Sequence, residues 1–395
     1  MSVAGARPNF MKLASIARAI EVHNASNKNP TIEHLIVHTG QHYDNRMSVL
    51  FFEELELPKP TINLNVGSAS HAIQTAEIMK RFEPVLLEHQ PDVMVLVGDV
   101  NSTVACALVA SKIKYDSEQN GSLAEGQNSR GSRPLIAHVE AGLRSFDRDM
   151  PEEINRILTD ALSDLLFITE EDAILNLQRE GIAREKIYFV GNVMIDTLLK
   201  NLKKAEQLNS TVIRSDFHLN RGDGYALVTL HRPSNVDQPE TLNALMGCLK
   251  TISSKIPIIF PMHPRTKGNL EKFGIYQRMS ESNGILITEP LGYLEFLGLL
   301  RSARLVLTDS GGIQEETTFL RIPCITLREN TERPVTITLG TNYLVGIHLE
   351  EILETAFAVL DGRGKKGEIP PLWDGKAGQR IVEALINKMV RAAYD

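Results

Sequence analysis

The chain has 395 residues, a formal net charge of −7 at pH 7 and 43% hydrophobic residues. Its length predicts two domains, and this ordinary composition excludes a disordered or fibrous protein. The net negative charge argues against a surface that binds nucleic acid. Because the sequence has no apolar run of about 18 residues, we expect a chain that neither spans a membrane nor is exported. The three cysteines, Cys106, Cys248 and Cys324, lie far apart in apolar surroundings and predict reduced core thiols.

Short apolar runs alternate with longer amphipathic stretches from one end of the chain to the other. This alternation is typical of parallel sheets covered by helices, so we predict an α/β fold. In the first half we expect strands at 2–4, 34–38, 93–97, 135–139 and 165–168, and helices at 10–22, 71–88, 102–113 and 152–163. The pattern then restarts, with strands expected at 188–190, 225–230, 256–260, 285–288, 305–308 and 324–327.

Two sheets of similar size predict a first domain at 1–168 and a second at 169–377, with a last helix at 378–393 that packs back on the first domain. Residues 116–133 are rich in Ser, Gly, Asn, Gln and Glu. Such a segment buries too little apolar surface to order itself, and we expect a mobile surface loop there.

The first strand leads into a turn with two cations. Gly5 allows a tight turn, Pro8 suits the first turn of a helix, and Arg7 and Lys12 flank the helix N-terminus. Two cations at a positive helix end disfavour each other, so we predict an anion between them. The alternative is that both are solvated surface charges.

Carboxylates follow the next strands of the first half. Asp99 comes after the strand at 93–97, Glu140 after 135–139, and Glu152 begins a helix soon afterwards. Because ligands gather at the carboxyl ends of parallel strands, these three acids are predicted to converge and to divide into a proton acceptor and a proton donor. Alternatively, Asp99 caps a helix, Glu152 complements a helix dipole, and Glu140 pairs with Arg144.

Two histidines occupy equivalent junctions in the second half. His231 follows the strand at 225–230, and His263 follows the strand at 256–260. Either alone is more often structural than catalytic. Their equivalent places favour contact with a ligand.

The strongest element is the run Asp309-Ser310-Gly311-Gly312 after the strand at 305–308. Paired glycines let backbone N–H groups approach phosphate oxygens at a helix start, and Glu316 lies one turn inside, where it suits ribose hydroxyls. Arg333 is expected to donate further hydrogen bonds to the phosphates. The alternative is dipole complementation by Glu315 and Glu316, which leaves the glycine pair unexplained.

Two motifs are missing from the sequence. It contains neither Gly-x-Gly-x-x-Gly for a dinucleotide nor Gly-x-x-x-x-Gly-Lys-Ser/Thr for a nucleoside triphosphate. Nicotinamide redox chemistry and simple kinase chemistry are therefore disfavoured.

Taken together, the motifs resemble those of the non-hydrolysing UDP-N-acetylglucosamine 2-epimerases over nearly the whole chain. The family has the GT-B architecture, two Rossmann-like domains with a cleft between them. The matching runs are Gly5-Ala6-Arg7-Pro8, Gly40-Gln41-His42, Gly98-Asp99, His138-Val139-Glu140-Ala141-Gly142-Leu143-Arg144, Pro151-Glu152-Glu153-Ile154-Asn155-Arg156, His231-Arg232, Asp309-Ser310-Gly311-Gly312-Ile313-Gln314-Glu315-Glu316 and Thr331-Glu332-Arg333-Pro334.

The resemblance implies roles for individual residues. Catalysis would fall to Asp99, Glu140, Glu152 and His231. The uridine diphosphate would be held by Arg7, Lys12, His263, Ser310, Gly311, Gly312, Glu316 and Arg333.

The resemblance also implies the chemistry, an anti elimination of UDP through a 2-acetamidoglucal followed by re-addition. That scheme needs no redox cofactor and no obligatory metal. We expect a cytoplasmic homodimer that acts on a UDP-sugar for cell-surface polysaccharide, without nucleic acid or membrane.

Other functions remain open at this point. A GT-B glycosyltransferase is the main rival, although a transferase with one base has no need of three acids. A hydrolysing relative, a non-catalytic nucleotide-sugar sensor and an epimerase of 2,3-diacetamido uronic acid nucleotides are the others.

Overall fold

The computed structural model describes residues 1–40, 54–115, 133–209 and 224–392. Residues 116–132 of the predicted loop, like Gln41 and His42, lie outside these ranges. The chain divides into two compact units. Unit 1 is Met1–Thr197 with Pro371–Asp395, and unit 2 is Leu198–Pro370.

Unit 1 is built on a seven-stranded sheet in the order β3-β2-β1-β4-β5-β6-β7. Every neighbouring pair is parallel. Its central strands read as continuous apolar runs because helices cover both faces of a parallel sheet. The strands are β1 (Ser2–Ala4), β2 (Ile36–His38), β3 (Ile62–Asn63), β4 (Val93–Val97), β5 (Leu135–Val139), β6 (Leu165–Ile168) and β7 (Ile187–Phe189).

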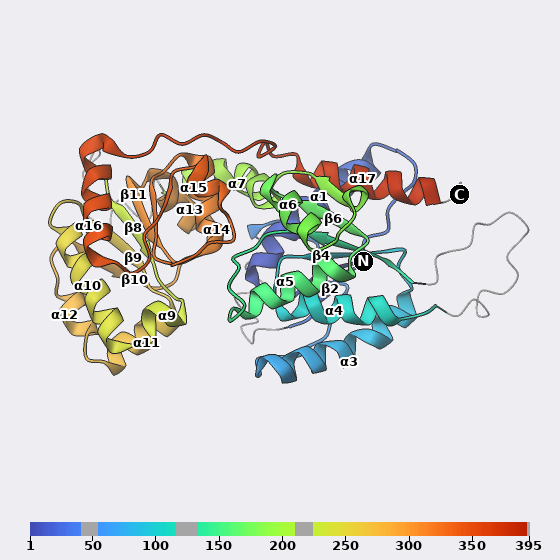
Figure 1. The fold of residues 1–395 in the computed structure, drawn as a ribbon, viewed down its shortest axis with the longest axis horizontal. Helices are drawn as coiled ribbons and strands as arrows, with labels where there is room; N and C mark the ends of the chain where they lie inside the picture. The colour runs from blue at the N-terminus through green and yellow to red at the C-terminus, as the bar shows by residue number, and fades with distance from the viewer. Residues whose placement is uncertain (41–53, 116–132, 210–223, 393–395) are drawn as a thin grey trace, which may run out of the picture. The chain divides into compact units, whose positions relative to one another are not determined.

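Helices connect these strands, and Figure 1 shows α3 and α4 side by side. In α3 the buried residues Ile78, Phe82 and Leu86 recur every fourth position, which places them on one face of the helix. The helices of unit 1 are α1 (Arg7–Ala25), α3 (His71–His89), α4 (Asn101–Lys112), α5 (Pro151–Leu162), α6 (Asp172–Arg179), the 3-10 turn η1 (Arg184–Lys186), the first part of α7 (Val193–Asn209), and α17 (Ala377–Ala392).

The strand expected at 188–190 as the start of the second sheet lies in the first sheet, so that assignment was wrong. β7 pairs in parallel with β6, and Phe167 lies opposite Tyr188. Successive strands of a parallel sheet usually become neighbours, and a short edge strand gives no signal of which sheet it joins. The predicted domain boundary at 168 thus falls between two paired strands.

Helix α5 turns a polar face inward. Its buried residues are Glu153, Asn155, Arg156, Thr159 and Asp160. Two of its apolar side chains, those of Ile154 and Leu158, are 37% and 43% exposed. Burying charged groups is costly unless they are paired, so this face must supply its own partners.

Helix α17 returns to unit 1 and packs against α1 (Figure 1). The buried carboxylate of Asp196 accepts hydrogen bonds from the Ser15 hydroxyl at 2.7 Å and from the Gly378 N–H at 2.8 Å. It therefore satisfies a free N–H at the start of α17 and ties that helix to α1 and α7.

Unit 2 contains a six-stranded parallel sheet in the order β10-β9-β8-β11-β12-β13. The sequence pattern did not indicate β3 or β13, since these strands have two and three residues and lie at sheet edges. The strands of unit 2 are β8 (Ala226–Thr229), β9 (Ile258–Pro261), β10 (Ile285–Thr288), β11 (Leu305–Thr308), β12 (Cys324–Thr326) and β13 (Asn342–Leu344).

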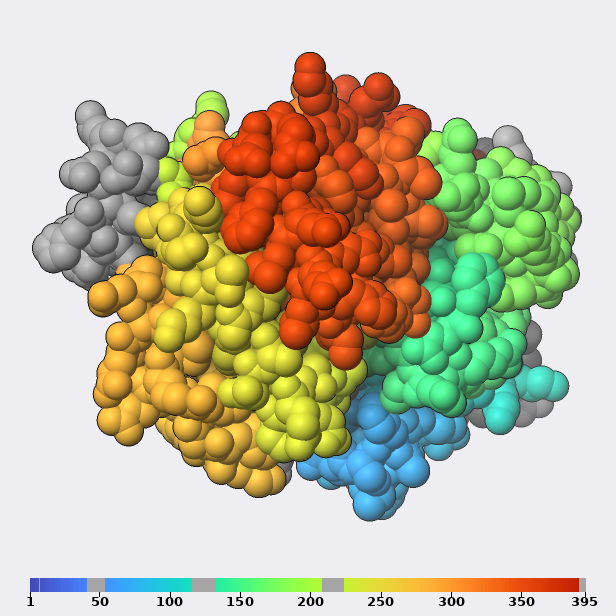
Figure 2. Space-filling model, turned by 60° about the vertical axis from the view of Figure 1, so that its left-hand side comes forward, coloured from blue at the N-terminus to red at the C-terminus, as the bar shows by residue number. Residues whose placement is uncertain are grey.

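Helices α10 and α16 of unit 2 pack together, and Figure 2 shows α16 in red beside α10 in yellow at the surface. Besides the C-terminal part of α7, the helices are α9 (Pro233–Val236), α10 (Pro239–Ser253), α11 (Pro264–Lys272), α12 (Tyr276–Ser280), α13 (Tyr293–Ser302), α14 (Gly311–Leu320), α15 (Val335–Thr338), α16 (Leu349–Ala358) and the π turn η2 (Val359–Arg363).

Both sheets reverse their strand order once, at β1/β4 in unit 1 and at β8/β11 in unit 2. In open parallel sheets a crevice forms at the carboxyl ends of the strands where the order reverses, and ligands bind there. The residues that follow β1, β4, β8 and β11 are therefore the first candidates for a site.

Candidate active site

The turn between β1 and α1 is fixed to the end of β4 by Asn9. Its side-chain oxygen accepts hydrogen bonds from the N–H groups of Gly5 and Ala6 at 3.1 and 3.0 Å. Its amide group donates to the Val97 carbonyl at 2.8 Å. Arg7 is the first residue of α1, as predicted, but its side chain lies outside the described part of the structure.

Lys12 and Glu140, expected to serve different roles, form a buried ion pair. Gly98 leaves room for this ion pair, because a Cβ on residue 98 would lie only 2.8 Å from Lys12 Nζ. Gly98 also has a φ of 69°, which favours glycine. The alternative pair of Glu140 with Arg144 is not formed, since Arg144 pairs with Asp160 and Glu180.

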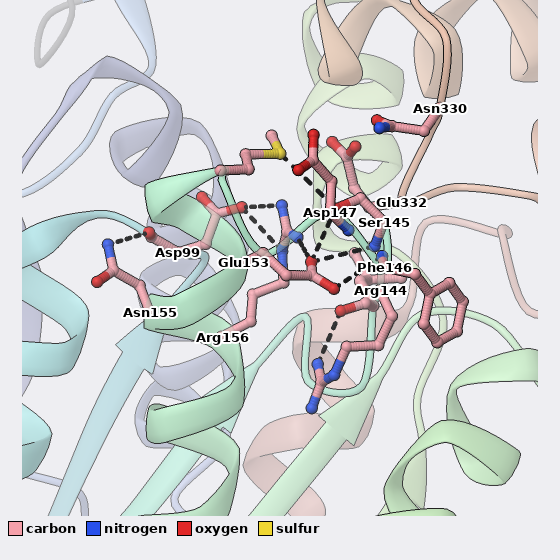
Figure 3. Close-up of polar contacts among 12 residues, drawn as sticks. Asp99, Arg144, Ser145, Phe146, Asp147, Glu153, Asn155, Arg156, Asn330 and Glu332 are labelled. Atoms are coloured by element: carbon pink, nitrogen blue, oxygen red, sulfur yellow. Dashed lines mark hydrogen bonds and ion pairs between the residues drawn. The ribbon is translucent and has the colours of Figure 1, made fainter.

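Asp99 is held by groups from α5. Its Oδ2 accepts hydrogen bonds from Arg156 Nε and Nη2 at 3.1 and 2.8 Å, and its main-chain carbonyl accepts one from Asn155 at 2.9 Å (Figure 3). The Asp99 side chain remains 24% exposed, whereas that of Glu140 is 2% exposed. A rigidly held but accessible carboxylate suits proton transfer.

Arg156 also pairs with Glu153, so it links Asp99 to Glu153 and not to the predicted Glu152 (Figure 3). Neither Arg156 nor Glu153 was predicted as a site residue. Their i,i+3 spacing on a helix was the available signal. Glu152 lies half-buried in the first turn of α5.

Glu153 holds the loop before α5 in an unusual conformation. Its carboxylate accepts hydrogen bonds from the Ser145 N–H at 3.0 Å, the Ser145 hydroxyl at 3.1 Å and the Phe146 N–H at 2.9 Å. Phe146 has a φ of 61° and is 74% exposed. A bulky residue adopts a positive φ only where its surroundings impose it, and Glu153 provides that constraint.

In unit 2, His231 follows β8 and Asp309 follows β11, and their side chains meet. Asp309 Oδ1 lies 2.9 Å from His231 Nδ1, and Asp309 Oδ2 accepts the N–H groups of His231 and Arg232, each at 2.9 Å. Burial by itself raises the pKa of Asp309, but the hydrogen bonds and charge of His231 and the two N–H donors bring it below its usual value. Asp309 therefore orients His231, a role that the sequence analysis did not assign.

His263 lies beside His231, with ring centroids 5.5 Å apart. His263 Nδ1 accepts the Arg265 N–H at 3.2 Å and caps α11. The proton of its neutral ring is then on Nε2, which can donate to a ligand. The structure thus places the two histidines side by side, and their contact with a ligand stays a prediction.

The predicted glycine pair opens α14, with Ser310 at its N-cap. A Cβ on Gly311 would lie 2.7 Å from Arg333 Nη1, so the glycine lets the guanidinium reach the start of the helix. Arg333 Nε lies 2.8 Å from Glu315 Oε1, and Arg333 also pairs with Glu332. A helix N-terminus beside an arginine is suited to hold an anion.

Glu316 is fully buried one turn inside α14. It accepts a hydrogen bond from the Tyr293 hydroxyl at 3.1 Å. Burial, with a smaller effect from the charge of Glu315, raises the pKa of Glu316 to about 8, although the Tyr293 hydrogen bond acts in the opposite direction. The folded protein therefore keeps this carboxyl protonated at neutral pH.

This raised pKa predicts a stability effect. Between the ordinary pKa of 4.5 and about 8, the folded chain holds a proton on Glu316 that the unfolded chain has lost, so stability falls as pH rises through this window. We expect Glu316→Gln to remove that component from the Tm measured between pH 5 and pH 9. Glu350→Gln, an exposed acid of the same unit, is the control, and equal pH slopes for wild type and Glu316→Gln would contradict the assignment.

The family model of UDP-N-acetylglucosamine 2-epimerase matches residues 24–116 and 120–386. The chain belongs to the UDP-N-acetylglucosamine 2-epimerase family. This epimerase, an isomerase, is 46% identical over 392 residues to a UDP-N-acetylglucosamine 2-epimerase of Methanocaldococcus jannaschii, covering 97% of each chain.

Two further relatives bear on fold and substrate. The crystal structure of the Methanocaldococcus jannaschii UDP-GlcNAc 2-epimerase in complex with UDP-GlcNAc and UDP has a TM-score of 0.82 at 44% identity, covering 98% of this chain and 99% of that one. A UDP-2,3-diacetamido-2,3-dideoxy-D-glucuronate 2-epimerase of Pseudomonas aeruginosa is 39% identical over 98% of each chain. The predicted α/β, GT-B architecture of this epimerase is confirmed. Among its described residues, no helix combines the length and apolar character that a bilayer crossing requires.

Proposed function

We propose that this epimerase inverts carbon 2 of UDP-N-acetylglucosamine to give UDP-N-acetylmannosamine. The observation that carries the proposal is the start of α14, where Ser310, the two glycines and Arg333 lie together in an arrangement suited to a diphosphate, with Glu316 one turn inside. The Methanocaldococcus jannaschii relative with 46% identity has this activity by name, which supports the same substrate here.

The acids of unit 1 account for the chemistry. Carbon 2 has no adjacent carbonyl group, so its proton is not acidic enough for simple removal and return. Elimination of UDP is therefore the available route to inversion. In our proposal a carboxylate takes this proton while the bond between carbon 1 and the UDP oxygen breaks, and the electron pair of the C–H bond forms the C1–C2 double bond of a 2-acetamidoglucal. Asp99, held by Arg156 but accessible, is the first candidate for this transfer, with Glu152 as the second acid.

The unit 2 residues would act on the leaving group. UDP departs with an added negative charge, which the α14 N-terminus, Arg333 and the Nε2–H of His263 would stabilise, while Asp309 would hold His231 in its orientation. Protonation of carbon 2 from the opposite face, with return of the UDP oxygen to carbon 1, completes the inversion. The ion pair of Glu140 with Lys12 would determine the electrostatic environment of Asp99.

A second substrate has specific support. The Pseudomonas aeruginosa relative acts by name on a UDP-2,3-diacetamido uronic acid and is 39% identical over 98% of this chain. The same elimination fits that sugar, because the reacting centre is again carbon 2 beside an acetamido group. Both nucleotide sugars therefore belong in the test.

Incubation of the purified protein with UDP-N-acetylglucosamine in deuterated water is expected to place deuterium on carbon 2 while the sugar stays on UDP. Proton NMR and mass spectrometry of the recovered nucleotide sugar measure this. Free N-acetylmannosamine as the product would indicate a hydrolysing enzyme, and reaction only after addition of an acceptor would indicate a glycosyltransferase. Label in the diacetamido uronic acid substrate alone would assign the enzyme to that sugar.

A further inference from the structure

Glu332 lies between two arginines at the start of α14. Its Oε2 accepts a hydrogen bond from Arg328 Nη2 at 2.8 Å, and its Oε1 pairs with Arg333 Nη1. A Cβ on Gly311 would lie 2.6 Å from the same Oε1, so the carboxylate lies against the first residue of the helix. All three charged side chains are buried. A carboxylate of the protein itself is therefore located where the proposed function requires phosphate oxygens.

Arg328 has a nitrogen without an acceptor. Its Nη1 is buried and makes no hydrogen bond to any residue in the described ranges of the chain. A guanidinium stays charged in proteins and cannot lose this proton, so the missing acceptor has a cost in free energy. Arginine and a carboxylate frequently form two parallel hydrogen bonds. Arg328 therefore has the capacity for a second hydrogen bond to Glu332.

Arg333 is anchored to α14 independently of Glu332. Its Nε lies 2.8 Å from Oε1 of Glu315, which belongs to that helix. The loop that carries Arg333 is also held, because the Thr331 hydroxyl donates to Gln314 Oε1 at 2.7 Å. Arg333 Nη1 can therefore exchange one acceptor for another while the guanidinium stays at the start of the helix.

We propose that Glu332 is an exchangeable counter-ion of the diphosphate site and that Arg328 is the partner that receives it. When a phosphate oxygen accepts the N–H of Arg333 Nη1, Glu332 leaves Arg333 and forms its second hydrogen bond with Arg328 Nη1. The bond that Glu332 loses is thus replaced, and the buried Nη1 gains its acceptor. This inference rests on the proposed function in so far as α14 holds the diphosphate.

The charges of this cluster favour an exchange over a fixed carboxylate. Two carboxylates, Glu315 and Glu332, face two guanidinium groups, so their charges cancel before the negative charge of a diphosphate is added. Like charges repel strongly in a buried site. Movement of Glu332 toward Arg328 takes its charge away from the phosphates and frees an N–H of Arg333 for them. Arg328 and Glu332 are therefore positioning residues that act on UDP through Arg333.

Titration calorimetry with UDP at constant ionic strength tests this exchange. In Glu332→Gln the competing carboxylate is removed, and we expect the Kd for UDP to fall by about tenfold, the effect of one charged hydrogen bond. In Arg328→Met the carboxylate has no second partner and stays on Arg333, so the Kd should rise. Damage to the structure would weaken binding in both variants. An unchanged or higher Kd in folded Glu332→Gln would overturn the proposal.

The double variant separates the exchange from a general effect of charge. If Arg328 acts by receiving Glu332, then Arg328→Met should not weaken UDP binding once Glu332→Gln is present. The Kd of the double variant should then equal that of Glu332→Gln within about twofold, the error of such additivity tests. Equal weakening in both backgrounds would show that Arg328 acts on UDP directly or through its charge alone, and would overturn the proposal.

Glu329→Gln is the matched control for Glu332→Gln. It removes the same charge from an exposed position of the same loop and should leave the Kd for UDP unchanged. Uridine is the matched ligand, because it lacks the diphosphate. Its binding, followed by NMR titration, should be the same in wild type and Glu332→Gln, and an equal gain for uridine and UDP would overturn the exchange.

A milder substitution covers variants that do not fold. Arg328→Lys keeps the charge but lacks the planar fork that makes two parallel bonds, so it should also raise the Kd for UDP. A wild-type Kd in Arg328→Lys would overturn the proposal without any other variant.

The proposed function and this inference fail separately. If the wild-type protein binds UDP but places no deuterium on carbon 2 of either nucleotide sugar, the proposed function fails and the Kd values still decide the exchange. If deuterium is incorporated but Glu332→Gln binds UDP no more tightly than wild type, the exchange alone is overturned.

Discussion

Asp99→Asn is expected to lower kcat for epimerisation by about 10²–10⁴-fold, the range that a positioned general acid or base contributes. The asparagine oxygen can still accept the two N–H groups of Arg156, so the local structure should survive the change. What is lost is the ability to take and hold a proton. Deuterium exchange at carbon 2 measures kcat, and titration calorimetry measures the Kd for UDP, which should not change.

The matched control for this variant is Asp149→Asn, the same substitution at an exposed acid of the loop before α5. It should leave kcat and Kd at their wild-type values. If Asp99→Asn loses UDP binding together with exchange, Asp99 has a structural function and the proton transfer belongs to another acid. Glu152→Gln, made in parallel, identifies whether Glu152 is that acid.

Asp309→Asn should reduce both activity and stability. The amide oxygen can replace Oδ2 as the acceptor of the N–H groups of His231, Arg232 and Asn235, but hydrogen bonds to a neutral oxygen are weaker than those to a buried carboxylate, so we expect a loss of about 1–3 kcal/mol. Without the carboxylate, His231 is no longer held through Nδ1. We therefore expect kcat to fall by at least about 10²-fold, as for other residues that act in proton transfer.

Urea unfolding and steady-state kinetics separate the two effects of Asp309→Asn. His231→Asn should share the kinetic loss but not the full loss of stability, because the His231 side chain is partly exposed. Asp237→Asn, at a surface ion pair with Arg265, is the control and should change stability by less than about 1 kcal/mol. Normal kcat in Asp309→Asn would show that His231 needs no orientation.

The sequence pattern predicted the sheets well where the strands are central and continuous, as at β4, β5 and β11. It failed at the edges, where β3 and β13 are too short for a periodic signal and where β7 could join either sheet. It also located α5 by its apolar spacing, yet Ile154 and Leu158 of that spacing face outward. Periodicity detects a helix, but partners decide which face of the helix is buried.

The candidate site was likewise predicted only in part. Residues that directly follow central strands, such as Asp99 and His231, were predicted from position alone, because parallel strands end at one edge. The groups that hold them were not. Arg156 and Asp309 act through contacts between segments far apart in the chain, and no local spacing in the sequence specifies those pairs.

The return of α17 to α1 has a consequence for synthesis on the ribosome. Unit 2 is one uninterrupted stretch, Leu198–Pro370, so all of it has been made before the helix that completes unit 1 appears. Domains generally fold as units during synthesis, and unit 1 is complete only after α17 has been made. We therefore expect nascent unit 2 to reach its native state first, although translation of unit 1 begins first, and unit 1 to wait for α17 with part of the α1 surface uncovered.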